Sequence, residues 1–247
     1  MRVAKIPAVS WRDLPQALDL LKKKLSWKNL DRLCVGSTGL WAPQDKKLAR
    51  TLLRGRARSI CVMSDLELAH AAAFAGGPGV LIIAGTGSVG LSKDEKGLWR
   101  RAGGLGPLLG DEGSGFWIGR QALRDPILNR ALKSDPLVFA HAKQPVRQIA
   151  ALAPRVFSLK LKRAHDLREK AAQELASLAV HACRDMKFLN AIPISWRGGL
   201  FENPLFLKSF LRALKHINAD FVPAAPKLPA EQAAATLNFS TAARIHS

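Results

Sequence analysis

Two glycine-rich segments hold the residues best suited to chemistry. The first, Gly85-Thr86-Gly87-Ser88, follows the apolar run 80–84, and the second, 103–115, contains the acidic pair Asp111-Glu112. Because glycine has no Cβ, backbone N–H groups in such segments can approach an anion closely. We therefore expect the first segment to hold nucleotide phosphates and the second to form an acidic loop that binds a polar substrate. A glycine hairpin without any ligand is the alternative for the first segment.

The residues after Gly85 distinguish between two kinds of nucleotide site. Residues 85–90 spell G-x-G-x-x-G, which alone is a weak indication of a dinucleotide site. A dinucleotide-binding turn leads directly into a helix. Here residues 88–92 have an extended pattern, 93–97 form a polar turn, and an extended pattern resumes at 98–99. The sequence thus predicts an antiparallel hairpin with the glycines at its bend, which argues against NAD.

Two aspartates lie where a predicted helix begins. Asp65 stands between a strand at 60–63 and a helix at 66–75, so its carboxylate should project into a cleft. Asp111 is expected at the N-cap of the helical pattern 116–123. For both residues the alternative is structural, because carboxylates at helix starts commonly cap the helix or complement its dipole.

Together these segments resemble the BadF/BadG/BcrA/BcrD ATPase family, and most closely its N-acetylglucosamine kinases. The resemblance is carried mainly by residues 64–65, 84–88, 103–106 and 109–115, and more weakly by 34–40 and 192–200. It implies an α/β fold of the actin-like ATPase type (ribonuclease H-like, the group of sugar kinases, Hsp70 and actin). It also implies two lobes, here 1–78 and 79–247, with a boundary at the glycines and proline of 76–79. The N-terminal lobe is expected to lack its first strands.

The resemblance further implies ATP-dependent phosphorylation of an amino sugar such as N-acetylglucosamine, with Mg²⁺. Asp65 would be the general base. The other implied roles are phosphate binding by Gly85, Thr86, Gly87 and Ser88, passage of the adenosine end over Gly198 and Gly199, and sugar binding by Gly104, Asp111 and Glu112. No residue of the chain is assigned as a metal ligand.

The chain departs from the family pattern at two places. No Asp-Gly-Gly-Gly-Thr-type turn precedes Lys5, and residues 10–13 instead resemble the capped start of an amphipathic helix. We expect either a shortened form of a longer protein or a degenerate relative that binds nucleotide or sugar without turnover. In the segment 228–235, expected beside the adenine base, Gln232 stands where the family has glycine.

Charge raises a hypothesis of a different class. The 247 residues carry 38 Lys and Arg against 19 Asp and Glu, a net charge of +19. The basic clusters share segments with periodic leucines, so we expect the polar faces of surface helices, with nonspecific attraction to polyanions. A nucleic-acid-binding protein is the rival interpretation, although no recognisable reading motif is present and the six tryptophans are scattered. The clusters are 22–24, 46–50, 54–58 and 160–163.

Cysteine and histidine usage excludes several kinds of site. Cys34, Cys61 and Cys183 are widely spaced, two of them in apolar strand-like runs, which predicts buried thiols rather than a zinc or iron–sulfur site. The six histidines show no metal-ligand spacing. No signal peptide or spanning segment is evident, so we expect a cytoplasmic protein without membrane contact; a homodimer is left open.

Overall fold

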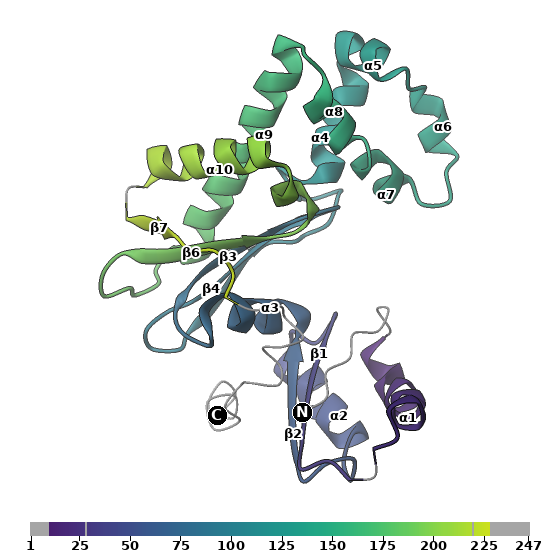
Figure 1. Ribbon diagram of the computed structural model, residues 1–247, viewed down its shortest axis with the longest axis vertical. Helices are drawn as coiled ribbons and strands as arrows, with labels where there is room; N and C mark the ends of the chain where they lie inside the picture. Colours follow the sequence, from purple (N-terminus) through teal and green to yellow (C-terminus); the bar gives the residue numbers. More distant parts are fainter. Residues whose placement is uncertain (1–9, 28, 219, 228–247) are drawn as a thin grey trace. The chain divides into compact units, whose positions relative to one another are not determined.

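A computed structural model describes residues 10–27, 29–218 and 220–227. The chain divides into two compact units, one containing the chain up to Gly77 and the other Pro78–Ala225 (Figure 1). The second unit therefore ends well before residue 247, where the second expected lobe ends. The segment 228–235, expected near the adenine base, lies outside the described residues.

The first unit is built on two parallel strands. β1 (Arg32–Ser37) and β2 (Ser59–Ser64) pair residue for residue over their whole length. One side of the pair packs against a short 3₁₀ helix η1 (Trp11–Asp13) and the helices α1 (Leu14–Leu25) and α2 (Pro43–Leu52). The core there is formed by Trp11, Leu14, Leu18, Val35, Leu40, Ala49, Leu53 and Val62.

Local sequence explains how the first unit's helices begin. The Ser10 hydroxyl accepts a hydrogen bond from the Arg12 N–H, and α1 then presents the amphipathic stripe that the sequence predicts. α3 (Asp65–Phe74) follows β2 directly, with Ser64 as its N-cap. The ends of β1 and β2 therefore deliver Thr38 and Asp65 to the same edge of the sheet.

The second unit contains a mixed five-stranded sheet. Its strands are β3 (Gly79–Ala84), β4 (Ser88–Lys93), β5 (Trp99–Gly103), β6 (Ile192–Arg197) and β7 (Phe221–Pro223), in the order β5-β4-β3-β6-β7. β3 pairs antiparallel with β4 and parallel with β6, so the predicted hairpin at residues 80–92 is confirmed. Pro223 lies in the edge strand β7, where a missing N–H is tolerated.

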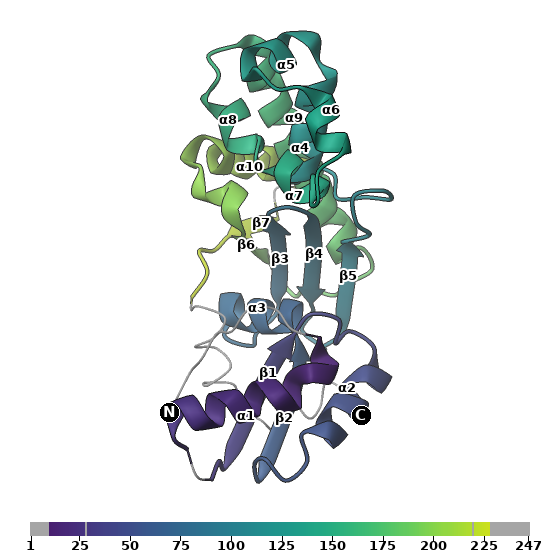
Figure 2. The same cartoon turned by 90° about the vertical axis from the view of Figure 1, so that its right-hand side faces the viewer.

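Helices cover this sheet and extend beyond one of its ends (Figure 2). The long helix α9 (Lys162–Cys183) packs on β3, β4 and β5, and α10 (Pro204–Ile217) packs on α9. The remaining helices are α4 (Gly115–Arg124), α5 (Pro126–Leu132), α6 (Pro136–Ala140), α7 (Pro145–Ala150), α8 (Ala153–Ser158) and the 3₁₀ helix η2 (Gly199–Glu202). Each of the helices α5 to α8 has a proline in its first turn, where no N–H is lost from the helix.

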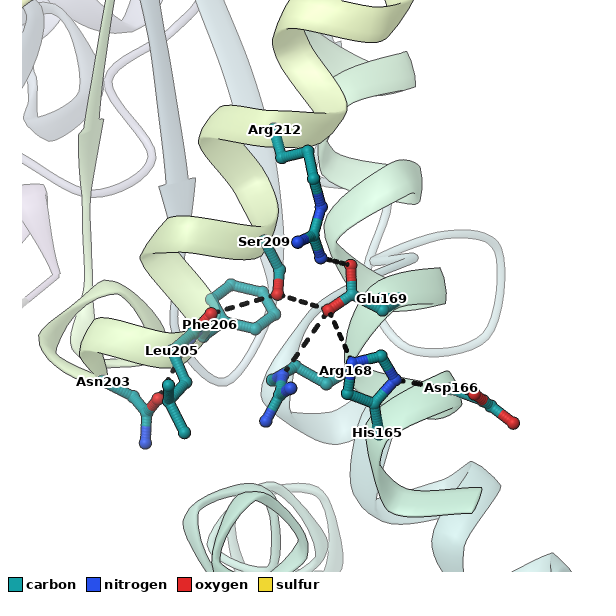
Figure 3. A network of polar contacts seen from close by, with 9 residues as sticks. All are labelled: His165, Asp166, Arg168, Glu169, Asn203, Leu205, Phe206, Ser209 and Arg212. Carbon is teal, nitrogen blue, oxygen red and sulfur yellow. Dashed lines mark hydrogen bonds and ion pairs between the residues drawn. The ribbon is translucent and has the colours of Figure 1, made fainter. Parts of the chain in front are cut away.

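In addition to their apolar contact, α9 and α10 are joined by a network of polar contacts (Figure 3). The Ser209 hydroxyl donates to Glu169 Oε1 at 2.6 Å, and the Arg212 guanidinium donates to Glu169 Oε2. His165 lies one turn before Glu169, its Nε2 3.7 Å from Oε1. Burial raises the pKa of Glu169, but the hydrogen bonds from Ser209 and Arg212 outweigh it and lower the pKa overall.

Among the described residues, no helix combines the length and apolar character needed to cross a membrane.

Candidate active site

The bend between β3 and β4 is a three-residue loop of Gly85, Thr86 and Gly87. The Gly85 N–H donates to the Gly87 carbonyl at 2.9 Å, which closes the bend. No backbone hydrogen bond from the N–H of Thr86 or Gly87 is found among the described residues. A Cβ at Gly85 would have no atom within 4 Å, so the backbone there faces open space. These features match the bare amide groups that a phosphate oxygen needs.

Two N–H groups at the start of helix α4 hold this loop by hydrogen bonds. The Gly115 N–H donates to the Gly85 carbonyl at 2.8 Å, and the Phe116 N–H donates to the Thr86 carbonyl at 3.1 Å. The first amide groups of a helix have no partner within it, and here two of them hold the bend. The loop carbonyls are thus turned towards the helix, and the N–H groups of the loop remain for a ligand.

Asp111 lies against the bend but does not cap α4. Ser114 is the N-cap, since its hydroxyl accepts from the Trp117 N–H, so the expectation for Asp111 was wrong. Asp111 instead adopts a left-handed backbone, φ +63°, and is 7% exposed. Such a conformation costs energy in a residue other than glycine and is held here by the packing of the loop.

The carboxylate of Asp111 requires glycine at position 87. A Cβ on Gly87 would stand 2.6 Å from Asp111 Oδ2, closer than any real contact. No hydrogen bond to this carboxylate is found in the described part of the chain. A nearly buried carboxylate without a partner, beside N–H groups that are not used in backbone hydrogen bonds, suits a ligand with hydroxyl donors.

Ser88 and Gly104 connect the bend to the acidic loop. The Ser88 hydroxyl is buried and donates to the Glu112 carbonyl at 2.8 Å, which positions the loop rather than presenting the hydroxyl outwards. The Gly104 N–H donates to the Ser88 carbonyl at 2.9 Å, and Arg101 Nη2 donates to the Gly104 carbonyl at 2.7 Å. The side chain of Glu112 is exposed. Ser88 is therefore a connecting residue in this structure.

The glycine pair after β6 reaches the same edge of the sheet. Gly198 has φ +109°, and a Cβ there would stand 2.3 Å from the Ala84 carbonyl oxygen, immediately before the bend. Gly199 has no atom within 4 Å of the corresponding position and is exposed. The second unit thus brings together three of the predicted elements: the bend 85–87, Asp111 and Gly198-Gly199.

The first unit holds Asp65 at the carboxyl end of its own strand pair. Asp65 is exposed, and the Thr38 hydroxyl donates to its Oδ2 at 3.3 Å. Sequence reasoning assigned Thr38 no role, because 27 positions separate it from Asp65 and only the pairing of β1 with β2 brings them together.

Asp65 is not the cap of α3, which was the structural alternative for this residue. The Ser64 hydroxyl accepts from the Glu67 N–H at 3.1 Å, while Glu67 Oε2 accepts from the Ser64 N–H at 2.8 Å. Glu67 is buried and also accepts from Lys46 Nζ at 2.6 Å. The exposed Asp65 carboxylate instead accepts from the Leu66 N–H at 3.0 Å through Oδ1, in the first turn of α3, while Oδ2 accepts from Thr38.

Comparison with known proteins agrees with this arrangement. Residues 9–234 match the model of the BadF/BadG/BcrA/BcrD ATPase family. The chain belongs to this family. It is 34% identical over 101 residues to an N-acetylmuramic acid/N-acetylglucosamine kinase of Clostridium acetobutylicum, which covers 40% of this chain and 33% of that protein. It is 38% identical over 96 residues to an N-acetyl-D-glucosamine kinase of Dictyostelium discoideum, covering 37% and 30%.

The match therefore spans about a third of the length of these curated relatives. Among solved structures, a candidate N-acetylglucosamine kinase from Chromobacterium violaceum superimposes with a TM-score of 0.68 at 22% identity, covering 91% of this chain and 83% of that one. A second candidate N-acetylglucosamine kinase, from Porphyromonas gingivalis, gives 0.69 at 17% identity, covering 94% and 87%. At this identity the likeness establishes the fold, which is that of the actin-like ATPases.

Proposed function

We propose that this member of the family transfers the γ-phosphoryl group of ATP to a hydroxyl of an amino sugar such as N-acetylglucosamine. One observation carries the proposal: within the second unit, the bend 85–87 with its unused N–H groups lies against the partnerless carboxylate of Asp111. The first feature suits phosphates and the second suits sugar hydroxyls. Relatives of this chain carry the names of kinases of such sugars.

The nucleotide would lie along the edge formed by two glycine turns. The N–H groups of Thr86 and Gly87 would bind phosphate oxygens and stabilise the charge that spreads over the transferred group. The open backbone at Gly199 leaves room for the adenosine end. Gly85 is equally free of neighbouring atoms, so the residues present fit a nucleotide.

The sugar would be held by the acidic loop. Asp111 would accept hydrogen bonds from ring hydroxyls, with Gly104 and Glu112 shaping the loop around it. Mg²⁺ prefers oxygen ligands and keeps several waters. No group of three or more metal-ligating side chains is found in the described residues, so Mg²⁺ would be held by the phosphates and by a water on the exposed Glu112.

Asp65 would act as the general base. Its carboxylate accepts the proton of the sugar hydroxyl while that oxygen bonds to the γ-phosphorus and the bond to the bridging oxygen of ADP breaks. The hydrogen bond from Thr38 would orient the carboxylate. Thr38 is therefore a positioning residue in this proposal.

The test is a coupled measurement of ADP release with N-acetylglucosamine, together with calorimetric titration of ADP and of the sugar. Asp65→Asn should lower kcat by about 10²–10⁴-fold and leave both dissociation constants nearly unchanged. Thr38→Val should lower kcat less, and Thr38→Ser should restore it. Undiminished turnover in Asp65→Asn would exclude Asp65 as the base. Binding of ADP and sugar without any turnover would assign the chain as a non-catalytic relative.

A further inference from the structure

Two adjoining cavities lie in the first unit, away from Asp65. The larger has a volume of about 420 Å³ and is lined by Trp27 and Asn29 among others, and the smaller has about 360 Å³. They share Gly55, Ala57 and Arg58, so they form one continuous groove. We call this the α2 groove.

All the charged residues that line the smaller part of the α2 groove are positive. Lys47 and Arg50 lie on α2 and Arg54 just beyond its end, at spacings of three and four that place them on one helical stripe. All three are exposed, and no acidic partner for any of them is found among the described residues. Arg58 lies where the two cavities meet, and its Nη1 is 3.6 Å from Asp31 Oδ1, so its charge is partly compensated.

The larger part combines apolar and polar groups. Trp27 is half-buried there, beside the apolar side chains of Leu18, Leu30 and Leu33. Its charges are partly compensated, because Arg56 forms a hydrogen-bonded ion pair with Asp19. Unlike the smaller part, this part offers an aromatic ring with hydrogen-bonding neighbours.

The larger part of the α2 groove lies at the opposite end of the strand pair from the candidate base of the same unit. Asp31 and Arg58 lie just before β1 and β2 begin, whereas Thr38 and Asp65 lie just after these strands end. Six strand residues at about 3.3 Å each separate the two ends by roughly 20 Å. The groove is therefore a separate feature that the proposed phosphoryl transfer does not use.

We propose that the α2 groove binds single-stranded nucleic acid, with phosphates along the stripe Lys47, Arg50 and Arg54 and a base stacked on Trp27. Proteins that bind single strands without sequence preference combine a basic groove with an aromatic platform. The groove has both, side by side. A purely basic surface would suit any polyanion, and it is Trp27 that favours an unpaired base. This use accounts for part of the +19 charge.

The test measures binding of a fluorescein-labelled 12-nucleotide oligothymidylate by fluorescence anisotropy at several salt concentrations. Three phosphate contacts predict a slope of about −2 for log K against log [salt], at roughly −0.7 per contact on a single strand. Lys47→Gln/Arg54→Gln should weaken binding and make the slope shallower by about 1.4.

The matched control is Lys208→Gln/Lys215→Gln on α10. These lysines are exposed and lie seven positions apart, as Lys47 and Arg54 do. Their substitution removes the same amount of charge. The control should bind like the unmodified protein. Equal weakening by both double variants would mean that binding follows net charge alone, and it would overturn the proposal.

Trp27→Ala tests the stacked base independently. It should weaken oligothymidylate binding by at least about five-fold, whereas Trp27→Phe should restore most of the affinity and inorganic polyphosphate binding should not change. Photocrosslinking of oligothymidylate to the unmodified protein, followed by peptide mapping, should label Trp27 or its neighbours. Oligothymidylate binding that is insensitive to Trp27→Ala and displaced by polyphosphate would identify a generic polyanion surface and refute the assignment.

Discussion

Gly87 and Asp111 define the candidate site at the scale of single residues. The carboxylate of Asp111 occupies the space that any side chain at position 87 would need. Gly85, two positions earlier, has open space instead. The two glycines of one bend therefore serve different purposes, and substitution by alanine separates them.

Gly87→Ala should displace the Asp111 carboxylate and weaken N-acetylglucosamine binding by about ten-fold or more, because the added Cβ would stand 2.6 Å from Oδ2. Gly85→Ala should leave sugar binding unchanged and weaken ADP binding, since its methyl group would enter the open space assigned to phosphate. Calorimetric titration with each ligand measures both effects. Equal sugar affinity in the two variants would contradict the role given to Gly87.

Gly198 and Gly199 form a second matched pair, this time for stability. Gly198→Ala combines φ +109° with a Cβ 2.3 Å from the Ala84 carbonyl oxygen, so it should cost at least about 2 kcal/mol of unfolding free energy. Gly199→Ala meets no atom within 4 Å and should change stability by no more than about 0.5 kcal/mol. Urea denaturation of both variants distinguishes a packed glycine from an open one.

At the scale of elements, the contact of α9 with α10 depends on Glu169. Its pKa is lowered in the folded protein, so its contribution is fully present above the unfolded value near 4.3 and is lost as the pH falls through the folded value. Glu169→Gln should therefore destabilise the protein by about 1–3 kcal/mol at pH 7. In urea titrations the difference should shrink as the pH falls below the unfolded value and through the lowered folded value. A difference that persists in acid would show that packing, not charge, is responsible.

The buried pair Lys46 and Glu67 holds α2 to the start of α3. Lys46→Met should cost about 3–5 kcal/mol because it leaves a buried carboxylate without its cation. Lys46→Met combined with Glu67→Gln should recover part of that loss, since no charge then remains buried. Thermal unfolding of Lys46→Met, Glu67→Gln and the double variant measures the coupling, and simple additivity would indicate that the ion pair itself contributes little.

Elements with local causes could be predicted from the sequence. The hairpin of β3 and β4 follows from an apolar run that ends at closely spaced glycines, and α10 begins at Pro204 because Asn203 caps it. The position of Asp111 could not be predicted. Its left-handed backbone depends on contact with Gly87, far away in the chain, and Ser114 caps the helix in its place. Thr38 was missed for the same reason.

At the scale of the whole molecule, the larger hydrophobic core lies entirely between Val80 and Phe221, inside the second unit. We expect residues 78–225, produced alone, to unfold cooperatively on heating and to bind ADP, because the bend and both glycine turns are included. Differential scanning calorimetry and ADP titration test this. A broad, non-cooperative transition would show that the second unit needs the rest of the chain to fold.

The mixed pairing around β3 has a practical consequence. β3, β6 and the start of α4 all deliver their loops to one edge of the sheet, whereas the β4–β5 turn lies at the other. In that turn Asp94 accepts from the N–H groups of Lys96 and Leu98, while Lys96 itself points into solvent. A fluorophore or affinity handle attached at Lys96 would thus report on or immobilise the protein at the end of the sheet opposite the candidate site.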